Sequence, residues 1–176
     1  MKDMSLYQQV MADQFANLAP EVKAFHSVLG VRQYSGYCNF EPAENPIAKL
    51  LCLGLGLPIR AFSESFGFEL NATRDREIWS RYFPGFLMRS EMSRSNGKLV
   101  ERFGLVRFHY RLVVESAALV MMLESVSVLG VKLPGFLAPT IAAREHGVDG
   151  RFHFSVRADW RPLGRISAYS GWLKIA

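Results

Sequence analysis

Charged side chains inside apolar runs are the residues of this sequence best placed to do chemistry. Arg81 alternates with Trp79 and Phe83, and Glu101 lies two positions after Leu99. Alternate residues of a strand share one face, so both ions are predicted to point inward. An ion on an apolar face is costly unless it is paired. The sequence therefore predicts a buried contact between Arg81 and Glu101.

This predicted pair has two interpretations, a structural salt bridge or part of a ligand-binding pocket. Pockets for small molecules are mostly apolar and hold a few convergent polar groups. Replacing Glu101 by Ala is expected to cost about 3–5 kcal/mol if the pair is structural, and little if it serves a ligand. The candidate ligand-binding residues are Trp79, Arg81, Arg89, Glu101 and Glu145.

The sequence lacks the common motifs of catalytic, nucleotide-binding and metal sites. It has no Gly-x-Gly-x-x-Gly after a predicted strand, no phosphate-binding loop, no Gly-x-Ser-x-Gly and no metal-ligand spacing. His109 and His153 could meet if their strands pair, yet no Cys, Asp or Glu pattern accompanies them, and His109 alternates with Arg107 and Arg111 like a surface residue. We therefore expect no metal and no cofactor, and no catalytic residue can be named.

The net charge of +5 is unevenly distributed along the 176 residues. Residues 73–111 hold nine Arg or Lys against four Asp or Glu. In the run from Arg107 to Arg111, strand alternation places the basic side chains opposite Phe108 and Tyr110. Nucleic-acid binding needs exposed aromatic and basic groups together. We therefore interpret the excess as solvated strand faces and expect no nucleic-acid partner.

Helix signals are confined to the first third of the chain. Ser5 is a candidate N-cap for a first helix with apolar positions as far as Phe15, and Pro20 suits the start of a second helix over residues 20–26. A strand is expected over residues 30–40. Asn45 precedes a third helix, residues 47–53, which is apolar apart from Lys49. That helix is predicted to be buried or to close one mouth of a cavity.

From Phe66 onward the hydrophobic period changes from 3.6 to 2, which favours strands. Turn signals recur at spacings of about 8–12 residues, including a hairpin step at Asn96-Gly97. The sequence predicts eight or nine strands in total, with at most one helical turn after residue 66, near residues 132–139. The predicted class is α+β: a long antiparallel meander forming a curled sheet or barrel, with N-terminal helices packed on it, in a single domain of residues 1–176.

Cysteine usage and hydropathy bear on the cellular compartment. Cys38 and Cys52 are the only cysteines and lack a metal-binding or redox spacing, so both are expected to be free thiols in a reducing cytosol. No segment reaches the roughly 20 apolar residues of a membrane span, and residues 1–4 do not resemble a secretory signal. We expect a cytoplasmic protein without a transmembrane segment.

Several separated motifs carry a family resemblance. They are LVERFG (residues 99–104), LGVKLPGFLAP (129–139), DGRFHFSV (149–156) and YSGWL (169–173), and residues 6–8 and 18–26 agree as well. Together they resemble the bacterial domain-of-unknown-function family 4166 over essentially the whole chain. The resemblance implies that members occur alone or behind a saccharopine-dehydrogenase-like domain. It implies no activity and no catalytic residue.

Three functional hypotheses follow. The first is a non-catalytic module that holds a hydrophobic small molecule in the curled sheet. The second is an interaction or accessory module for a dehydrogenase-like partner or for another copy of the chain. The third is an enzyme that uses Glu101 or His109 as a general base. Cavity volume separates them, because a large apolar void favours binding or catalysis, whereas a filled barrel with an apolar outer patch favours docking.

Overall fold

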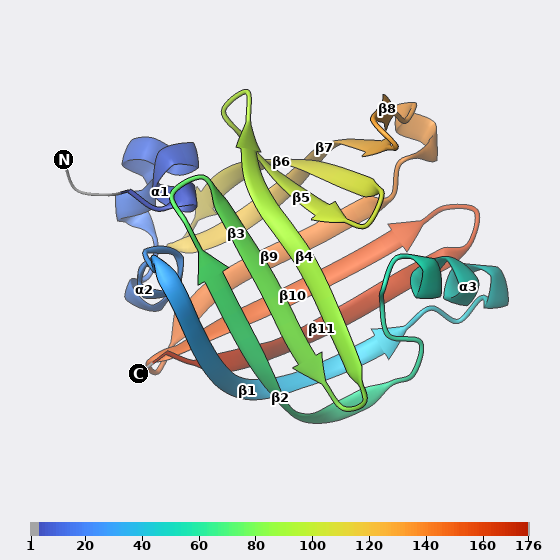
Figure 1. Ribbon diagram of the computed structural model, residues 1–176, viewed down its shortest axis with the longest axis horizontal. Coiled ribbons are helices and arrows are strands. Elements are labelled where there is room, and N and C mark those ends of the chain that lie inside the picture. The colour runs from blue at the N-terminus through green and yellow to red at the C-terminus, as the bar shows by residue number, and fades with distance from the viewer. Residues whose placement is uncertain (1–3, 176) are drawn as a thin grey trace.

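The computed structural model describes residues 4–175, which form an 11-stranded antiparallel sheet and five short helical segments (Figure 1). The helical segments are α1 (Leu6–Met11), η1 (Ala12–Asn17), α2 (Pro20–His26), α3 (Pro46–Gly54) and η2 (Gly135–Leu137). The strands are β1 (Gly30–Pro42), β2 (Phe62–Ala72), β3 (Arg76–Phe83), β4 (Phe86–Ser95), β5 (Lys98–Phe103), β6 (Val106–Glu115), β7 (Ala118–Val128), β8 (Val131–Lys132), β9 (Thr140–Val148), β10 (Arg151–Trp160) and β11 (Gly164–Lys174).

The sheet closes on itself. Its strand order is β6-β5-β4-β3-β2-β1-β11-β10-β9-β7-β8, and β6 also pairs with β7. This second pairing produces a closed 10-strand antiparallel barrel, with the two-residue β8 outside the ring. Closure leaves the ten barrel strands without an open edge. The predicted curled meander is thus confirmed in its closed form.

Turn chemistry explains the hairpins. Asn96 and Gly97 both have positive φ angles, 50° and 75°, and they connect β4 to β5. Asp149 and Gly150 do the same between β9 and β10, at 50° and 73°. Asn, Asp and Gly tolerate this left-handed conformation, which matches the right-handed twist of the flanking strands. The hairpin predicted at Asn96-Gly97 is confirmed.

Helix caps also follow from local sequence. The Ser5 hydroxyl accepts a hydrogen bond from the backbone N–H of Gln8, whose side chain accepts one from the Ser5 N–H in return. The first helix is shorter than predicted: α1 ends at Met11, and the chain continues as a 3-10 helix because Ala12 adopts a φ of 48°. The second helix begins at Pro20, and Asn45 caps the third, as expected.

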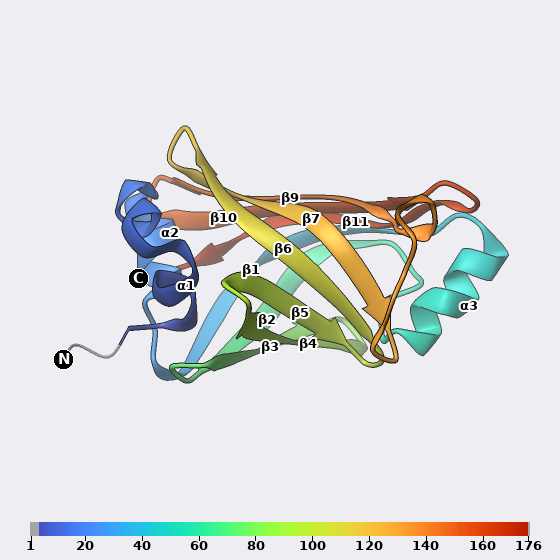
Figure 2. The ribbon, with the colours of Figure 1, turned by 90° about the horizontal axis from the view of Figure 1, so that it is seen from above.

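The N-terminal helices plug one end of the barrel (Figure 2). Leu6, Tyr7, Val22 and Phe25 are completely buried there. Phe25 stacks on Phe152 of β10 with ring centroids 4.2 Å apart, so the plug continues the aromatic core of the barrel. The prediction that these helices pack on the sheet is confirmed.

The α+β description needs correction, because the molecule is a mainly β barrel whose helices lie at its two ends. The strand count was also too low, since residues 4–175 form eleven strands where eight or nine were expected. One of the additional strands is β8, which is only two residues long. Helix after residue 66 is limited to η2, as predicted.

The third helix is not buried as a whole. Ala48 and Cys52 of α3 are fully buried, whereas Ile47 and Leu50 are 61% and 69% exposed. The Cys52 thiol lies 3.4 Å from the Ile166 carbonyl oxygen, so α3 contacts β11 along one narrow face. The prediction of a buried apolar helix was therefore wrong for most of its surface, because nothing packs on the outward side.

Cys38 and Cys52 are both buried and free, as predicted. Burial raises the pKa of the Cys38 thiol to about 12 and also raises the pKa of Cys52. Among residues 4–175, none of the helices has the length and hydropathy needed to cross a bilayer.

Candidate functional site

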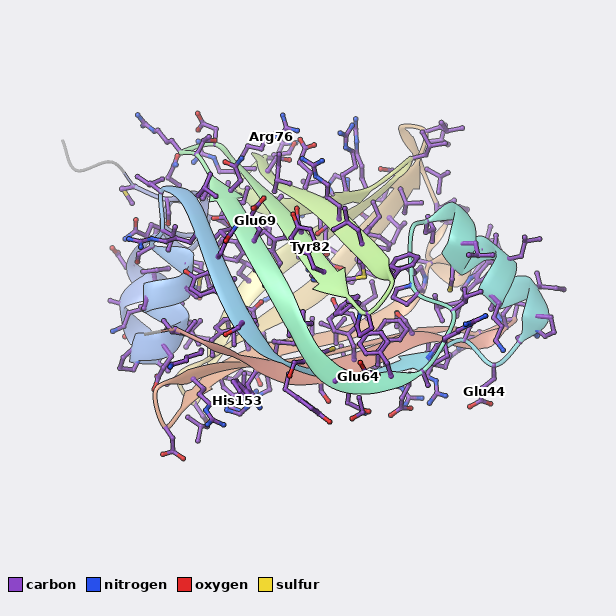
Figure 3. The ribbon with its side chains drawn as sticks, turned by 60° about the horizontal axis from the view of Figure 1, so that its bottom comes forward. Glu44, Glu64, Glu69, Arg76, Tyr82 and His153 are labelled. Atoms are coloured by element: carbon purple, nitrogen blue, oxygen red, sulfur yellow. The ribbon has the colours of Figure 1, made fainter. Side chains whose placement is uncertain are left out.

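The barrel core contains five ionisable side chains that are almost completely buried. Three are acids and two are bases, and none is more than 8% exposed: His26, Glu77, Arg81, Glu101 and Glu145. They come from α2, β3, β5 and β9, and alternation turns each strand residue inward. The outer face of β2 and β3 differs, since Glu69, Arg76 and Tyr82 point away from the core there (Figure 3).

Arg81 lies at the centre of this set but is weakly paired. Its Nη1 donates to the Ser90 hydroxyl at 3.2 Å, and its Nη2 is 4.0 Å from Glu101 Oε1. The guanidinium carbon lies 5.2 Å from the Trp79 ring centroid and 5.7 Å from that of Phe68. These are cation–π distances, so the aromatic walls offset part of the cost of burying the charge. The predicted buried contact between Arg81 and Glu101 is confirmed, at long range.

Glu101 lies beside Arg81 and two hydroxyl groups, those of Ser90 and Tyr110. Burial raises its pKa, while Arg81 and hydrogen bonds with Ser90 and Tyr110 act in the opposite direction. Tyr110 is buried as well, and burial together with the nearby Glu101 raises its pKa well above the ordinary value. Glu101 therefore has two neutral hydroxyl partners besides the distant Arg81, whereas the one hydroxyl partner of Arg81 is Ser90.

A second group joins the helical plug to the barrel wall. His26 Nε2 lies 2.6 Å from Glu145 Oε2 across 119 positions of sequence, and the Tyr7 ring stacks on the His26 ring with centroids 3.7 Å apart. His26 Nδ1 and the Tyr7 hydroxyl are buried and have no hydrogen-bond partner among residues 4–175. Burial, and then Glu145, raise the pKa of Tyr7.

Glu77 lies beside this group. Its Oε2 accepts a hydrogen bond of 2.9 Å from the Trp79 indole N–H, and its Oε1 has no partner among the described residues. Burial raises the pKa of Glu77 from 4.5 to about 7, against the opposing effect of His26. A carboxyl group with such a pKa changes charge near neutral pH, which is the behaviour of groups at functional sites.

The free space inside the barrel is small. One cavity of about 30 Å³ is lined by aromatic and aliphatic side chains together with two of the buried ions: Phe25, Phe66, Phe68, Trp79, Arg81, Phe83, Glu145, Phe152, Phe154, Val156, Tyr169 and Leu173. Such a volume holds about two water molecules. The barrel is thus filled by its own side chains, and the remaining space lies against Arg81 and Glu145.

A larger hollow, about 230 Å³, lies on the outer surface across β1, β11, β10 and β9. It exists because small side chains face outward on neighbouring strands, including Ala142, Ser155, Ala168 and Ser170. Its charged residues are Glu41 and Arg157 at exposed positions, and Arg157 is already paired with Asp159 at 2.6 Å. Despite its size it holds none of the buried ions, so the interior is the better candidate site.

The structure brings together four of the five predicted candidates. Trp79, Arg81, Glu101 and Glu145 are buried in the core. Arg89 is exposed and points outward, because it follows the inward-facing Met88 on β4, so it does not join the set. Arg89 was proposed for its charge alone, without an apolar strand face to turn it inward.

Sequence reasoning missed Glu77, His26 and Tyr7. Glu77 alternates with Trp79 and Arg81, so the rule that identified Arg81 would have found it. His26 and Tyr7 belong to helices, and no periodic pattern connects them to β9. His26 and Tyr7 join the buried ions only because α1 and α2 pack into the end of the barrel.

The possible meeting of His109 and His153 does not occur. His109 lies on β6, which pairs with β5 and β7, so it does not meet His153. His153 is instead opposite His146 on β9, with ring centroids 5.2 Å apart. Within residues 4–175, no group of three His, Cys, Asp or Glu side chains is arranged to hold a metal. His109 also faces away from Glu101, so the two do not form an acid–base pair.

Comparisons with known proteins give a family but no activity. A protein of unknown function from the DUF3598 family of Nostoc punctiforme is similar over 84% of this chain and 47% of its own, with 11% identity and a TM-score of 0.46. Rv2717c from M. tuberculosis is similar over 89% of this chain and 98% of its own, with 11% identity and a TM-score of 0.45. Neither similarity is strong enough to transfer a property.

This chain spans about half the length of the Nostoc protein. No curated protein matches the chain. The model of the family described as domain of unknown function DUF4166 matches residues 18–173. The chain therefore belongs to the DUF4166 family.

Proposed function

We propose that the protein binds a small, mainly apolar molecule inside the barrel and holds an acceptor group of that molecule, such as a carboxylate or carbonyl, on Arg81. One observation carries this proposal: Arg81 is a buried guanidinium that lines the cavity, donates one hydrogen bond, to Ser90, and lies 4.0 Å from the nearest carboxylate oxygen with which it pairs. A guanidinium has five N–H donors in a planar fork that matches a carboxylate.

Comparison with the surface supports this interpretation. On the outside of the barrel, Arg76 and Arg102 both approach Glu91 to 2.8 Å. Inside, where a close ion pair would be strongest, Arg81 and Glu101 remain 4.0 Å apart. A purely structural pair is expected to close to hydrogen-bond distance, because a buried charge without partners is costly. The separation leaves Arg81 donors free to meet an acceptor in the cavity.

The walls determine the kind of ligand. Six phenylalanines and one tryptophan surround the cavity beside Arg81. They favour an aromatic or aliphatic body, and the cavity of about 30 Å³ admits it only if some of these rings move. Side-chain rearrangement of this kind is common on ligand binding. We therefore expect the ligand to be small and its entry to be slow compared with diffusion.

The interaction-module hypothesis has separate support. A filled barrel with exposed apolar side chains was the expected signature of docking, and several such side chains lie around α3 and η2. This surface is on the outside of the barrel whereas Arg81 is buried inside it, so docking and interior binding are compatible. A dehydrogenase-like partner remains a proposal that rests on the family resemblance alone.

The test uses the intact chain and a defined probe. Intrinsic tryptophan fluorescence, to which Trp79 contributes, is followed during titration with benzoate, a small aromatic carboxylate, and native mass spectrometry of protein from its own host identifies any copurified molecule. Arg81→Met should weaken probe binding at least tenfold, which corresponds to about 1.4 kcal/mol. Arg89→Met is the matched control, an arginine on the adjacent strand that points outward.

Folding of the variants is checked by urea melts, and Arg81→Lys, which keeps the charge but loses the fork, should give an intermediate affinity. Equal binding by wild type and Arg81→Met would contradict the proposal. Absence of binding by wild type together with absence of any copurified molecule would contradict it as well.

A further inference from the structure

Exposed apolar side chains gather at the barrel end opposite the α1–α2 plug. They come from α3, from the β5–β6 turn and from the β7–β9 connection, and each is between 38% and 79% exposed. We call this surface the apolar end patch: Ile47, Leu50, Leu51, Leu53, Leu105, Leu129, Val131, Phe136 and Leu137. Figures 1 and 2 show α3 and β8 together at this end.

Contacts between the segments hold the patch in place. The Leu129 N–H donates to the Leu105 carbonyl at 3.0 Å, which ties the β7–β8 turn to the β5–β6 turn. The Trp160 indole N–H donates to the Leu137 carbonyl at 2.9 Å, which ties η2 to the end of β10. Cys52 anchors α3 on β11. The segments that carry the apolar side chains are therefore hydrogen-bonded to one another or to the barrel strands.

Basic side chains surround the patch without acidic partners. Lys49 lies on α3, Arg60 follows it, Lys132 is on β8 and Arg161 is in the β10–β11 turn. None of these four forms an ion pair with another residue of the range 4–175.

The two acids nearest to α3 share one arginine, so these three side chains together carry one negative charge, against four positive charges in the basic rim. Glu41 and Glu44 both pair with Arg165, and Figure 3 shows Glu44 beside α3, at the same end of the barrel. The patch is thus an apolar surface with a positive rim.

We propose that the apolar end patch docks on the surface of a bilayer that contains anionic lipid. Aliphatic side chains on an exposed helix insert at the boundary between headgroups and acyl chains, while basic side chains beside them attract anionic headgroups. The patch lies on protruding elements, α3 and the turn containing β8, and this shape suits a flat, soft surface (Figure 2).

Charge argues against a second copy of the chain as the occupant. In a two-fold symmetric dimer the same patch meets itself, so Lys49 and Arg161 would face the basic rim of the partner. Like charges brought together across an interface oppose association. An anionic membrane satisfies both features of the patch at once.

The experiment is cosedimentation of the full chain with vesicles of phosphatidylcholine alone or of phosphatidylcholine and phosphatidylglycerol at 3:1. We expect binding to the anionic vesicles, at least tenfold weaker binding to the neutral ones, and weakening by 0.5 M salt. The double variant Ile47→Ser/Leu50→Ser should lower binding to anionic vesicles at least tenfold. Val31→Ser is the control, because Val31 is 59% exposed on β1 near the plugged end.

Lys49→Gln/Arg161→Gln should weaken binding to anionic vesicles without changing binding to neutral ones. All substituted positions are at the surface, and thermal melts confirm that the variants fold. Wild-type protein that fails to sediment with anionic vesicles would overturn the proposal. A wild-type dimer in solution that Ile47→Ser/Leu50→Ser converts to a monomer would overturn it too, since the patch would then be an interface between copies. The outcome is independent of whether Arg81 binds a ligand.

Discussion

Two contacts between an acidic and a basic side chain lie inside the barrel, and they differ in the distance between the two groups. His26 Nε2 and Glu145 Oε2 are 2.6 Å apart, whereas Arg81 Nη2 and Glu101 Oε1 are 4.0 Å apart. The first contact crosses from the helical plug to β9, and the second spans β3 and β5 with β4 between them. Both lie in equally dry surroundings, since all four residues are at most 8% exposed.

The difference separates a contact that holds the fold from one that is available for binding. The His26–Glu145 contact fixes α2 in the barrel mouth, where its loss would release the plug. The Arg81–Glu101 contact joins strands that the hydrogen-bonded ladders already hold, so the fold depends on it less. Arg81 and Glu145 both line the cavity, but Glu145 is already in close contact with His26, at 2.6 Å. Four predictions test this contrast.

Removing the closed contact should have the largest effect. Glu145→Ala leaves His26 buried without its partner and is expected to lower the free energy of unfolding by about 3–5 kcal/mol. Urea melts at pH 7 measure this change. Glu115→Ala is the matched control, because Glu115 is an exposed acid that approaches Arg144 to 3.6 Å, and it should cost less than about 1 kcal/mol. A small effect of Glu145→Ala would show that the plug does not depend on this contact.

Glu77 next to the closed contact should make stability depend on pH. Its pKa of about 7 in the folded protein is raised by burial above 4.5, so the folded state binds its proton more tightly than the unfolded state. The stabilisation is therefore fully present below about pH 4.5 and is lost as pH rises through about 7.

Between pH 5 and pH 8, wild type should lose on the order of 2 kcal/mol of unfolding free energy relative to Glu77→Gln. Urea melts of both proteins at the two pH values give the difference, in which the titration of other groups largely cancels. Parallel pH profiles would mean that Glu77 titrates at its ordinary pKa.

Removing the open contact should cost less. Glu101→Ala is expected to lower the unfolding free energy by about 1–2 kcal/mol, because Arg81 keeps its hydrogen bond to Ser90 and its aromatic neighbours. The same melts as for Glu145→Ala give the comparison directly. A loss equal to that of Glu145→Ala would make Arg81–Glu101 a structural salt bridge and remove the main support for a ligand on Arg81.

The smallest effect should come from two short arginine contacts on the surface. Glu91 lies 2.8 Å from both Arg76 and Arg102, yet Glu91→Ala is expected to cost only about 0–1 kcal/mol because both arginines are about half exposed. Thermal melts at low and high salt would detect the change. If Glu91→Ala lowered the unfolding free energy more than Glu101→Ala does, the strength of these contacts would depend on distance rather than on burial.

The sequence by itself determined which way several side chains point and where the chain turns. The period of two placed Arg81 and Glu101 on the inner face, and Asn96-Gly97 specified a hairpin, because both depend on neighbouring residues only. The caps at Ser5 and Asn45 are equally local. The same rule applied to β3 would have added Glu77, so much of the β-strand part of the site was predictable.

Only the tertiary structure decided which of these side chains meet. The β6–β7 pairing that closes the ring, and the approach of His26 to Glu145 across 119 positions, depend on how the whole sheet curls and where the helices pack. The size of the cavity depends on how side chains from many elements pack together. Leu50 is exposed because no other segment of the described chain covers the outward side of α3. Local sequence patterns determine on which face of its strand or helix a side chain lies. The distance between segments that are remote in sequence depends on how the whole core packs.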